Sequence, residues 1–196
     1  ASSYFSKGFE YFKERVGEFI GFTLVYLIIS MVIGMIPIVG QLVSLIIAGP
    51  MSVAILIFTH RMHTNDSVEF SNFFDGFKKF TPLFATYIIQ MLIYLVLAIP
   101  LIFMIGFEFI QQIMASDIEA IMDYGALIQD NAMMIFAYVL LFVYIGISLR
   151  WSLHLAYFFD YSPIDAIKTS FTLVNKNWFS HLVFILLAAG AAILGL

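Results

Sequence analysis

Long apolar stretches alternate with short charged segments along the chain. Four stretches contain no Asp, Glu, Lys or Arg: 19–60, 80–107, 131–149 and 177–196. The first is too long for a single membrane-crossing helix, because a helix rises about 1.5 Å per residue and the hydrocarbon layer is about 30 Å thick. We therefore expect a helical hairpin with its turn at 36–41, where Pro37 disfavours further helix and Gly40 permits a sharp reversal.

This pattern predicts an all-α, polytopic membrane protein. Its five transmembrane helices are expected near 16–36, 41–60, 81–107, 132–158 and 179–196. Each stretch supplies the roughly 20 mainly apolar residues that a spanning helix needs. The whole chain, 1–196, is expected to form one transmembrane helical domain.

The positive charges indicate how these helices are oriented. All nine Lys and Arg residues fall into three segments, 7–15, 61–79 and 150–176. In the predicted order of spans, the three segments lie on one side of the membrane, and short loops rich in Lys and Arg face the cytoplasm. The sequence therefore predicts a cytoplasmic N-terminus, with the turn at Pro37 and the acidic connection 108–131 on the opposite side.

Short amphipathic stretches precede three of the spans, at 9–13, 74–78 and 163–171. We expect each to form an interfacial helix in the headgroup plane, with apolar side chains inward and basic ones toward lipid phosphates. They are either copies in an internal repeat, each an interfacial helix followed by a transmembrane hairpin, or ordinary connectors beside a membrane. If the stretches are copies of a repeat, the third copy lacks the second helix of its hairpin. The repeat therefore predicts a sixth span that this chain does not include.

A further surface helix is predicted between the third and fourth spans. Apolar residues recur at three- and four-residue steps over 110–122, with carboxylates at other positions. The carboxylates form either a solvated face or a patch that binds a cation or a partner. The solvated face is favoured because no calcium-loop spacing is present.

Composition supports a membrane environment and narrows the partners. The chain is 62% hydrophobic and only 11% charged, which leaves too little polar surface to cover a water-soluble globule. The formal net charge of -4 and the lack of a basic cluster argue against nucleic acid as a partner. The absence of cysteine removes disulfides, thiol nucleophiles and thiolate metal sites.

Four histidines, His60, His63, His154 and His181, fall at or near the basic ends of the predicted spans. Neutral imidazoles beside a carboxylate such as Asp160 can hold a transition metal. The sequence has no HExxH motif and no His-rich box. We therefore predict no metal, no cofactor and no catalytic residue, and we expect the histidines to lie at the membrane interface.

Ionisable groups within apolar spans are costly and usually functional. Arg150 lies inside the fourth predicted span, and Glu18 lies near the start of the first. We expect the Arg150 guanidinium to reach the cytoplasmic face or to pair with Glu18 or Asp160. Together with His154, these residues form a candidate polar cluster with a structural or functional role.

The second predicted span contains Gly49-Pro50, where the missing backbone N–H of proline should bend the helix. With Gln90, a polar residue inside the third span, Gly49 and Pro50 mark a candidate cavity. Small residues at four-residue steps, such as Gly17 with Gly21, predict close helix packing within the bundle or between two copies of the chain.

Several segments carry a resemblance to a known family: Arg150-Trp151-Ser152, the run 162–170, Asn177-Trp178 and 73–77. In these segments the chain resembles poorly characterised six-span bacterial inner-membrane proteins, related to the membrane domain attached to some glycerophosphodiester phosphodiesterases. The resemblance implies paired spans with cytoplasmic interfacial helices, a sixth span and a bacterial inner-membrane location. It implies no phosphodiesterase activity, because the catalytic domain of those hydrolases has no counterpart in this sequence.

The sequence leads to one main functional hypothesis and two alternatives. The main one is a non-enzymatic inner-membrane protein, either a lipid-contacting scaffold or an accessory subunit of a membrane assembly. Its partners would be membrane lipids and either another protein or a second copy of the chain. The first alternative is a small transporter or channel-like protein with a cavity near the Gly-Pro kink, and the second is an intramembrane metalloenzyme built on the histidines.

Overall fold

The protein is built from helices, with no strand in the part of the chain that the structure describes. The computed structural model describes residues 2–64, 66–106, 114, 129 and 132–194. In chain order the helices are α1 (Ser2–Glu14), α2 (Val16–Gly34), α3 (Val39–Ser52), α4 (Ala54–His63), the 3₁₀ helix η1 (Phe70–Lys79), α5 (Phe80–Ile105), α8 (Ala132–Leu149), α9 (Ser152–Phe158), α10 (Pro163–Lys176) and α11 (Trp178–Leu194). The predicted surface helix over 110–122 lies almost entirely outside the described residues.

Within those residues, four helical stretches are long and apolar enough to cross a membrane. They are Val16–Gly34, Val39–His63, Phe70–Phe103 and Ala132–Phe158. The pair of α10 and α11, bent by 89°, makes a fifth if it is counted as one span. The all-α prediction is confirmed, and the first, second and fourth predicted spans coincide with these stretches apart from a few residues at their ends. The third predicted span, 81–107, coincides with α5, but the apolar stretch begins earlier, with η1 at Phe70. The fifth predicted span coincides with α11.

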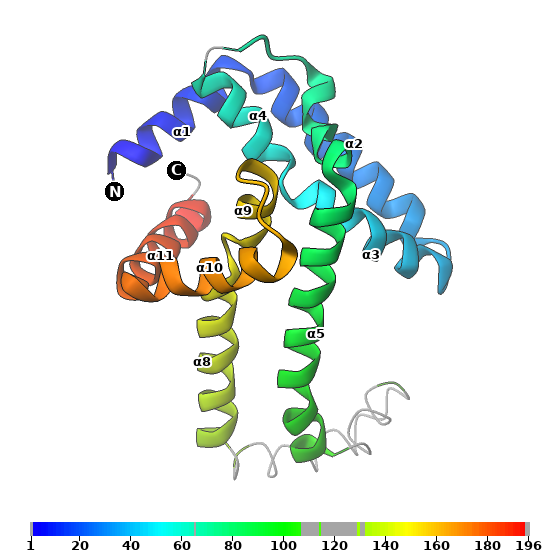
Figure 1. Cartoon of the computed structure of the whole chain (residues 1–196), viewed down its shortest axis with the longest axis vertical. Helices are drawn as coiled ribbons and strands as arrows, with labels where there is room; N and C mark the ends of the chain where they lie inside the picture. Colours follow the sequence, from blue (N-terminus) through cyan, green and yellow to red (C-terminus); the bar gives the residue numbers. More distant parts are fainter. Residues whose placement is uncertain (1, 65, 107–113, 115–128, 130–131, 195–196) are drawn as a thin grey trace.

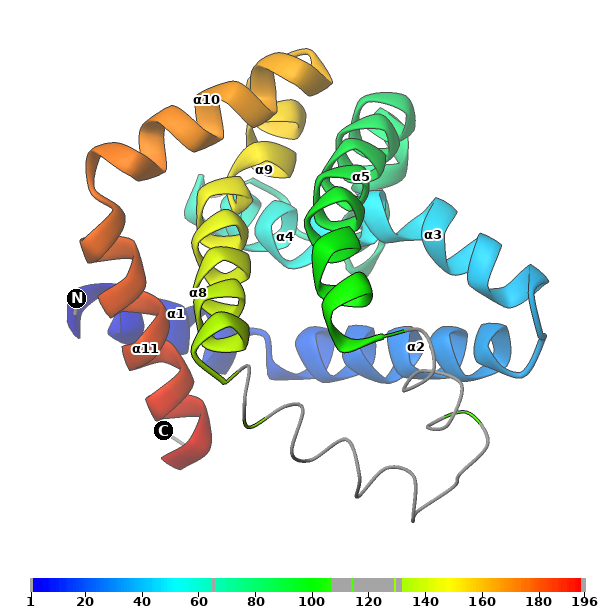
Figure 2. The ribbon, with the colours of Figure 1, turned by 90° about the horizontal axis from the view of Figure 1, so that it is seen from below.

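The helices form three groups: α5 with α8, α2 with α3, and α10 with α11. In Figure 1, α5 and α8 run along the long axis of the molecule, while the hairpin of α2 and α3 leans away on the side of α5. Figure 2, seen from below, places α10 and α11 on the other side, next to α8. The contacts between α3 and α5, and those that α10 makes with α5 and α8, join the groups.

The turn of the α2–α3 hairpin lies where the sequence predicted it, but the residue with the unusual backbone conformation is a different one. Residues 35–38 separate the two helices, and the reversal uses a positive φ of 63° at Ile38 rather than at Gly40. Gly40 is needed for close approach instead. A Cβ on Gly40 would lie 1.9 Å from the carbonyl oxygen of Ile33, so any side chain there would separate the helices.

Two of the four long apolar stretches are interrupted, and a following connector helix packs over each interruption. The second stretch breaks at Val53, three residues after Pro50, and η1 contacts both α3 and α4. The fourth breaks at Arg150 and Trp151, and α10 contacts both α8 and α9. The same sequence of connector, unbroken helix and broken helix thus occurs twice along the chain, which favours the internal repeat over unrelated connectors.

An aromatic core fills the space between α2, α4 and η1. Phe73 of η1 stacks on Phe58, with 4.0 Å between ring centroids, and on Phe22, with 4.3 Å. Phe19 contacts Phe58 and Phe73 edge-on. The stretch 74–78 was expected to lie flat in the headgroup plane. In η1 the neighbouring Phe73 is fully buried, so the inward apolar face of this segment meets the aromatic core of the protein.

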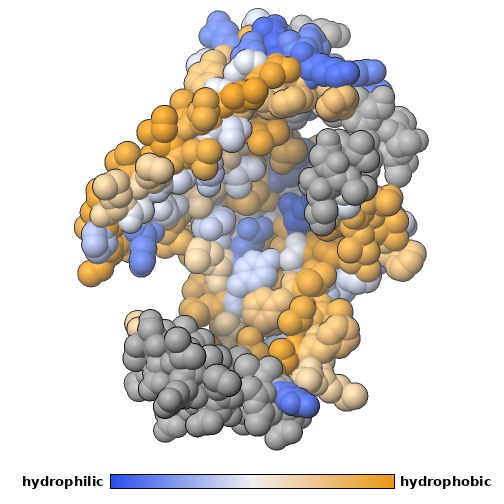
Figure 3. Space-filling model, turned by 180° about the vertical axis from the view of Figure 1, so that it is seen from behind, coloured by the Kyte–Doolittle hydropathy of each residue, from blue (hydrophilic) through white to orange (hydrophobic). Residues whose placement is uncertain are grey.

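The outward faces of the long helices are apolar and exposed. Large side chains with over a third of their surface exposed include Leu27, Ile28 and Met31 on α2, Leu95 and Val96 on α5, and Phe136 and Val139 on α8. Figure 3 shows the most hydrophilic surface at the top of the view, further hydrophilic residues in the middle of this face, and apolar surface along the sides. This distribution is the reverse of that in a water-soluble protein, and it suits a hydrocarbon environment.

Candidate functional site

The three basic segments of the chain meet on one side of the molecule. The Tyr11 hydroxyl and His63 Nδ1 are 2.8 Å apart, which joins α1 to the end of α4. Lys79 Nζ lies 2.5 Å from Asp160 Oδ1 and donates to the Tyr157 carbonyl at 2.7 Å, which joins η1 to the turn before α10. Parts of all three basic segments are therefore in contact through neighbouring segments of the fold.

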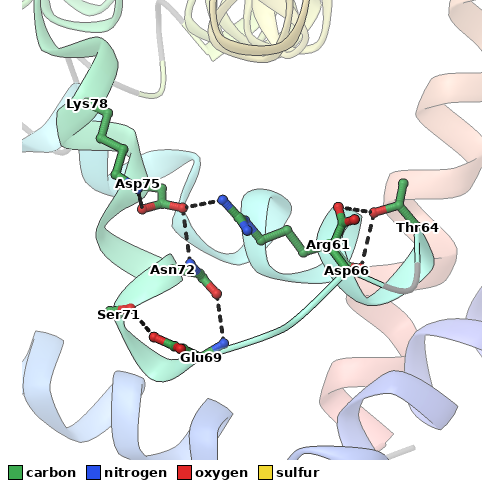
Figure 4. Close-up of polar contacts among 8 residues, drawn as sticks. All are labelled: Arg61, Thr64, Asp66, Glu69, Ser71, Asn72, Asp75 and Lys78. Atoms are coloured by element: carbon green, nitrogen blue, oxygen red, sulfur yellow. Dashed lines mark hydrogen bonds and ion pairs between the residues drawn. The ribbon is translucent and has the colours of Figure 1, made fainter.

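The polar centre on this side is Asp75, whose carboxylate is only 5% exposed (Figure 4). Its Oδ2 accepts hydrogen bonds from Arg61 Nη2 at 2.9 Å and from Asn72 Nδ2 at 3.2 Å. Its Oδ1 lies 2.6 Å from Lys78 Nζ. Asn72 in turn accepts a hydrogen bond from the Glu69 backbone N–H at 2.7 Å. The network ties the start and end of η1 to α4.

The geometry of Asp75 favours a structural role over a chemical one. Protein donors contact both carboxylate oxygens, so the group is a poor candidate for a general base that must take a proton from a substrate. Sequence reasoning missed this centre because 61–79 was treated as a surface segment. The signal was present: Asn72, Asp75 and Lys78 recur at three-residue steps beside Phe73, which suits a 3₁₀ helix with a polar edge.

The candidate cluster around Arg150 is not assembled. Glu18 pairs with Arg15 at 3.0 Å, and Asp160 pairs with Lys79. Both pairings predicted for Arg150 are therefore wrong. The Arg150 guanidinium lies 5.9 Å from the ring centroid of Trp151 and 5.7 Å from that of Phe184, which are cation–π distances.

The fourth member of that cluster, His154, lies in an aromatic environment. Its ring centroid is 4.6 Å from that of Phe158 and 5.3 Å from that of Trp151. Its Nδ1 is buried and has no hydrogen-bond partner among the described residues. His60 also contacts Phe158, with 4.7 Å between ring centroids, and His181 contacts Trp151. Within the described part of the chain, no group of three or more His, Asp or Glu side chains is placed to hold a metal ion.

A buried polar network closes the interruption between α8 and α9. Ser170 of α10 donates from its hydroxyl to the Ser148 carbonyl at 2.7 Å and accepts from the Trp151 backbone N–H at 3.1 Å. The Gln90 amide of α5 donates to the Leu149 carbonyl at 3.1 Å and to the Ser152 hydroxyl. These side chains satisfy backbone groups that a continuous helix would pair internally.

Ser170→Ala is expected to destabilise the protein by about 1–2 kcal/mol, because it leaves a buried carbonyl and a backbone N–H without their partner. Thermal unfolding of the purified protein in detergent measures the loss. Thr172→Ala is the control. Its hydroxyl is exposed and bonds only to the Lys168 carbonyl of the same helix, so its unfolding temperature should stay close to that of the parent chain.

The candidate cavity near the Gly-Pro kink is only partly present. Gly49 and Pro50 are themselves buried in contacts between helices. A Cβ on Gly49 would lie 2.7 Å from the carbonyl oxygen of Leu83. The carbonyl oxygen of Pro50 would lie 2.3 Å from a Cβ on Gly76. A cavity of about 480 Å³ lies beside them, between α2, α3 and α5. Gln90 lines a different cavity, of about 470 Å³, between α5 and α8.

Comparison of the chain with protein-family models, with curated proteins and with solved structures found no match in any of the three. The geometry alone therefore defines the class: an all-helical protein with four or five helices, among the described residues, that are long and apolar enough to span a membrane. Its polar side chains form structural networks at one end and at a helix interruption.

Proposed function

We propose that the chain is a non-enzymatic, multi-pass protein of a bacterial inner membrane that acts as a lipid-contacting scaffold or as an accessory subunit of a membrane assembly. The observation that supports this most directly is the exposed apolar surface along α2, α5 and α8. A side chain such as Met31, which is 71% exposed, is favourable against lipid tails or against an apolar partner.

The proposed orientation places the N-terminus in the cytoplasm. Its support is the meeting of all three basic segments on one side, through the Tyr11–His63 and Lys79–Asp160 contacts. Positive charge on short loops is retained on the cytoplasmic side when membrane proteins insert. The hairpin turn at 35–38 would then face away from the cytoplasm.

The polar groups support a non-catalytic role. Both carboxylate oxygens of Asp75 contact donors of the protein itself. Gln90 and Ser170 donate hydrogen bonds to backbone carbonyls at the α8–α9 interruption. A scaffold needs such groups only to keep its helices in place. An enzyme would need a nucleophile and a base within reach of a shared substrate position.

A small transporter is the second candidate, because of the cavity between α2, α3 and α5. A carrier needs a polar path from one face to the other. Toward the basic side, the residues next to the cavity belong to the stacked aromatic core of Phe22, Phe58 and Phe73, which offers no polar route. The cavity therefore favours binding from within the bilayer over passage through the bundle.

Native mass spectrometry of the protein released from lipid nanodiscs tests the proposal. We expect the chain to carry bound lipid and no metal. Stoichiometric transition metal that is lost in a His154→Ala variant would instead support the metalloenzyme. Recovery of the protein from the aqueous fraction without detergent would overturn the membrane proposal as a whole.

A further inference from the structure

The cavity between α2, α3 and α5 has an unusual lining for a membrane-spanning region. Polar residues contribute to it from all three helices: Tyr26 and Ser30 from α2, Gln41 and Ser44 from α3, and Tyr87 from α5. Its other lining residues are apolar or glycine, and none is charged. The cavity extends from Met51 and Met91 to the hairpin turn at Pro37, and so lies toward the end of the hairpin away from the basic segments.

The polar side chains of this lining are unpaired. None of the five forms a hydrogen bond within the described part of the chain, whereas other hydroxyls on the same helices do. Thr23 donates to the Phe19 carbonyl at 2.9 Å, and Thr86 donates to the Pro82 carbonyl at 2.7 Å. A hydroxyl or amide facing hydrocarbon without a partner is costly, so these side chains favour a ligand that can hydrogen-bond to them.

The lining also restricts the charge of that ligand. Hydroxyls and a carboxamide both donate and accept hydrogen bonds, which matches uncharged hydroxyl and ester groups. A phosphate would need a cation or a cluster of backbone N–H groups, and no Lys or Arg lines the cavity. The volume of about 480 Å³ falls within the range of small-molecule sites.

We propose that this cavity binds the uncharged glycerol-ester group of a membrane lipid, with the acyl chains extending into the bilayer. The ester carbonyls accept hydrogen bonds from the Ser and Tyr hydroxyls, and a free lipid hydroxyl donates to the Gln41 amide oxygen. The proposal rests on the proposed membrane location. The group could come from diacylglycerol, which carries a free hydroxyl, or from a phospholipid whose charged headgroup stays outside.

Gly34 provides a way to fill the cavity without disturbing the protein. It lines the cavity, and a Cβ built on it meets no atom within 4 Å. A Gly34→Leu side chain would therefore occupy ligand space. Gly17 is the matched control, because it lies on the same helix, has the same open surroundings and does not line the cavity.

Photocrosslinking of the full chain in nanodiscs tests the proposal, with photoreactive diacylglycerol and photoreactive phosphatidylethanolamine as separate probes. We expect saturable labelling of peptides from α2, α3 and α5, strong with Gly17→Leu and lost with Gly34→Leu. The double variant Ser30→Ala, Ser44→Ala should weaken binding about tenfold through two lost hydrogen bonds. Whichever probe labels more strongly identifies the source of the glycerol-ester group.

Equal labelling of the Gly34→Leu and Gly17→Leu variants by both probes would overturn the inference, as would labelling spread over all exposed helices. Partition of each variant into the membrane fraction is measured in parallel. A chain that inserts normally but shows no cavity-dependent labelling contradicts only the lipid site. A chain that does not insert contradicts the proposed function itself.

Discussion

Gly76→Ala is expected to destabilise the protein by about 3 kcal/mol, because the added methyl group cannot fit. Its Cβ would lie 2.3 Å from the carbonyl oxygen of Pro50 and 3.1 Å from a methyl carbon of Val53. The nearest atom belongs to a backbone, so η1 must move away from α3. That movement would also disturb the stacking of Phe73 on Phe58.

Thermal unfolding in detergent, with intrinsic fluorescence or light scattering as the readout, measures this loss. Gly17→Ala is the control, since a Cβ there meets nothing within 4 Å and alanine is the better helix former by up to about 1 kcal/mol. The two substitutions should therefore shift the unfolding temperature in opposite directions. A Gly76→Ala variant as stable as the parent chain would contradict the close contact between η1 and α3.

Asp75→Ala is the second large effect, with an expected loss of about 2 kcal/mol. Removing one partner of a fully buried ion pair costs about 3–5 kcal/mol. The loss at Asp75 is expected to be smaller because Arg61 is 33% exposed and Lys78 is 72% exposed, so water can solvate both cations once the carboxylate is gone. The freed Asn72 amide adds to the cost.

Asp160→Asn serves as the control for the loss of a carboxylate, because Asn tolerates the positive φ of 54° at this position. Its pair with Lys79 is also short, but Asp160 is 77% exposed, and exposed pairs contribute less than about 1 kcal/mol. The Asp75 variant should therefore unfold at a clearly lower temperature than the Asp160 variant. If the two variants unfold together, the network around Asp75 does not hold η1 in place.

The sequence predicted the helical architecture well because the signal is local. A long apolar helix can be recognised from the length of its uncharged stretch and the charges at its ends, whichever helices it packs against. Val16–Gly34 and Ala132–Phe158 were therefore predicted with nearly correct ends. The sequence left an internal repeat and ordinary membrane-side connectors as alternatives. The structure favours the repeat, because η1 and α10 each pack over a helix interruption.

The polar contacts could not be predicted in the same way, because they depend on which helices become neighbours. Arg61 and Asp75 come from different elements, and only the packing of η1 on α4 brings them together. Similarly, the sequence presents Ser170 as an ordinary residue of an amphipathic helix. Its role depends on the packing of α10 over the α8–α9 interruption, where its hydroxyl bonds to the Ser148 carbonyl. Arg150 and Asp160 are near in sequence, but the fold directs Asp160 to Lys79 instead.

Cysteine accessibility in bacterial spheroplasts tests the central claim, that lipid surrounds this chain and that its basic segments share one side. The chain has no native cysteine, so single variants at the exposed positions Ile38, Ser67 and Lys168 report on the hairpin turn, the α4–η1 connection and α10, respectively. We predict that a membrane-impermeant maleimide labels Ile38→Cys in intact spheroplasts, and labels Ser67→Cys and Lys168→Cys only after the membrane is permeabilised. Labelling of Ser67→Cys and Lys168→Cys from opposite sides would contradict the account.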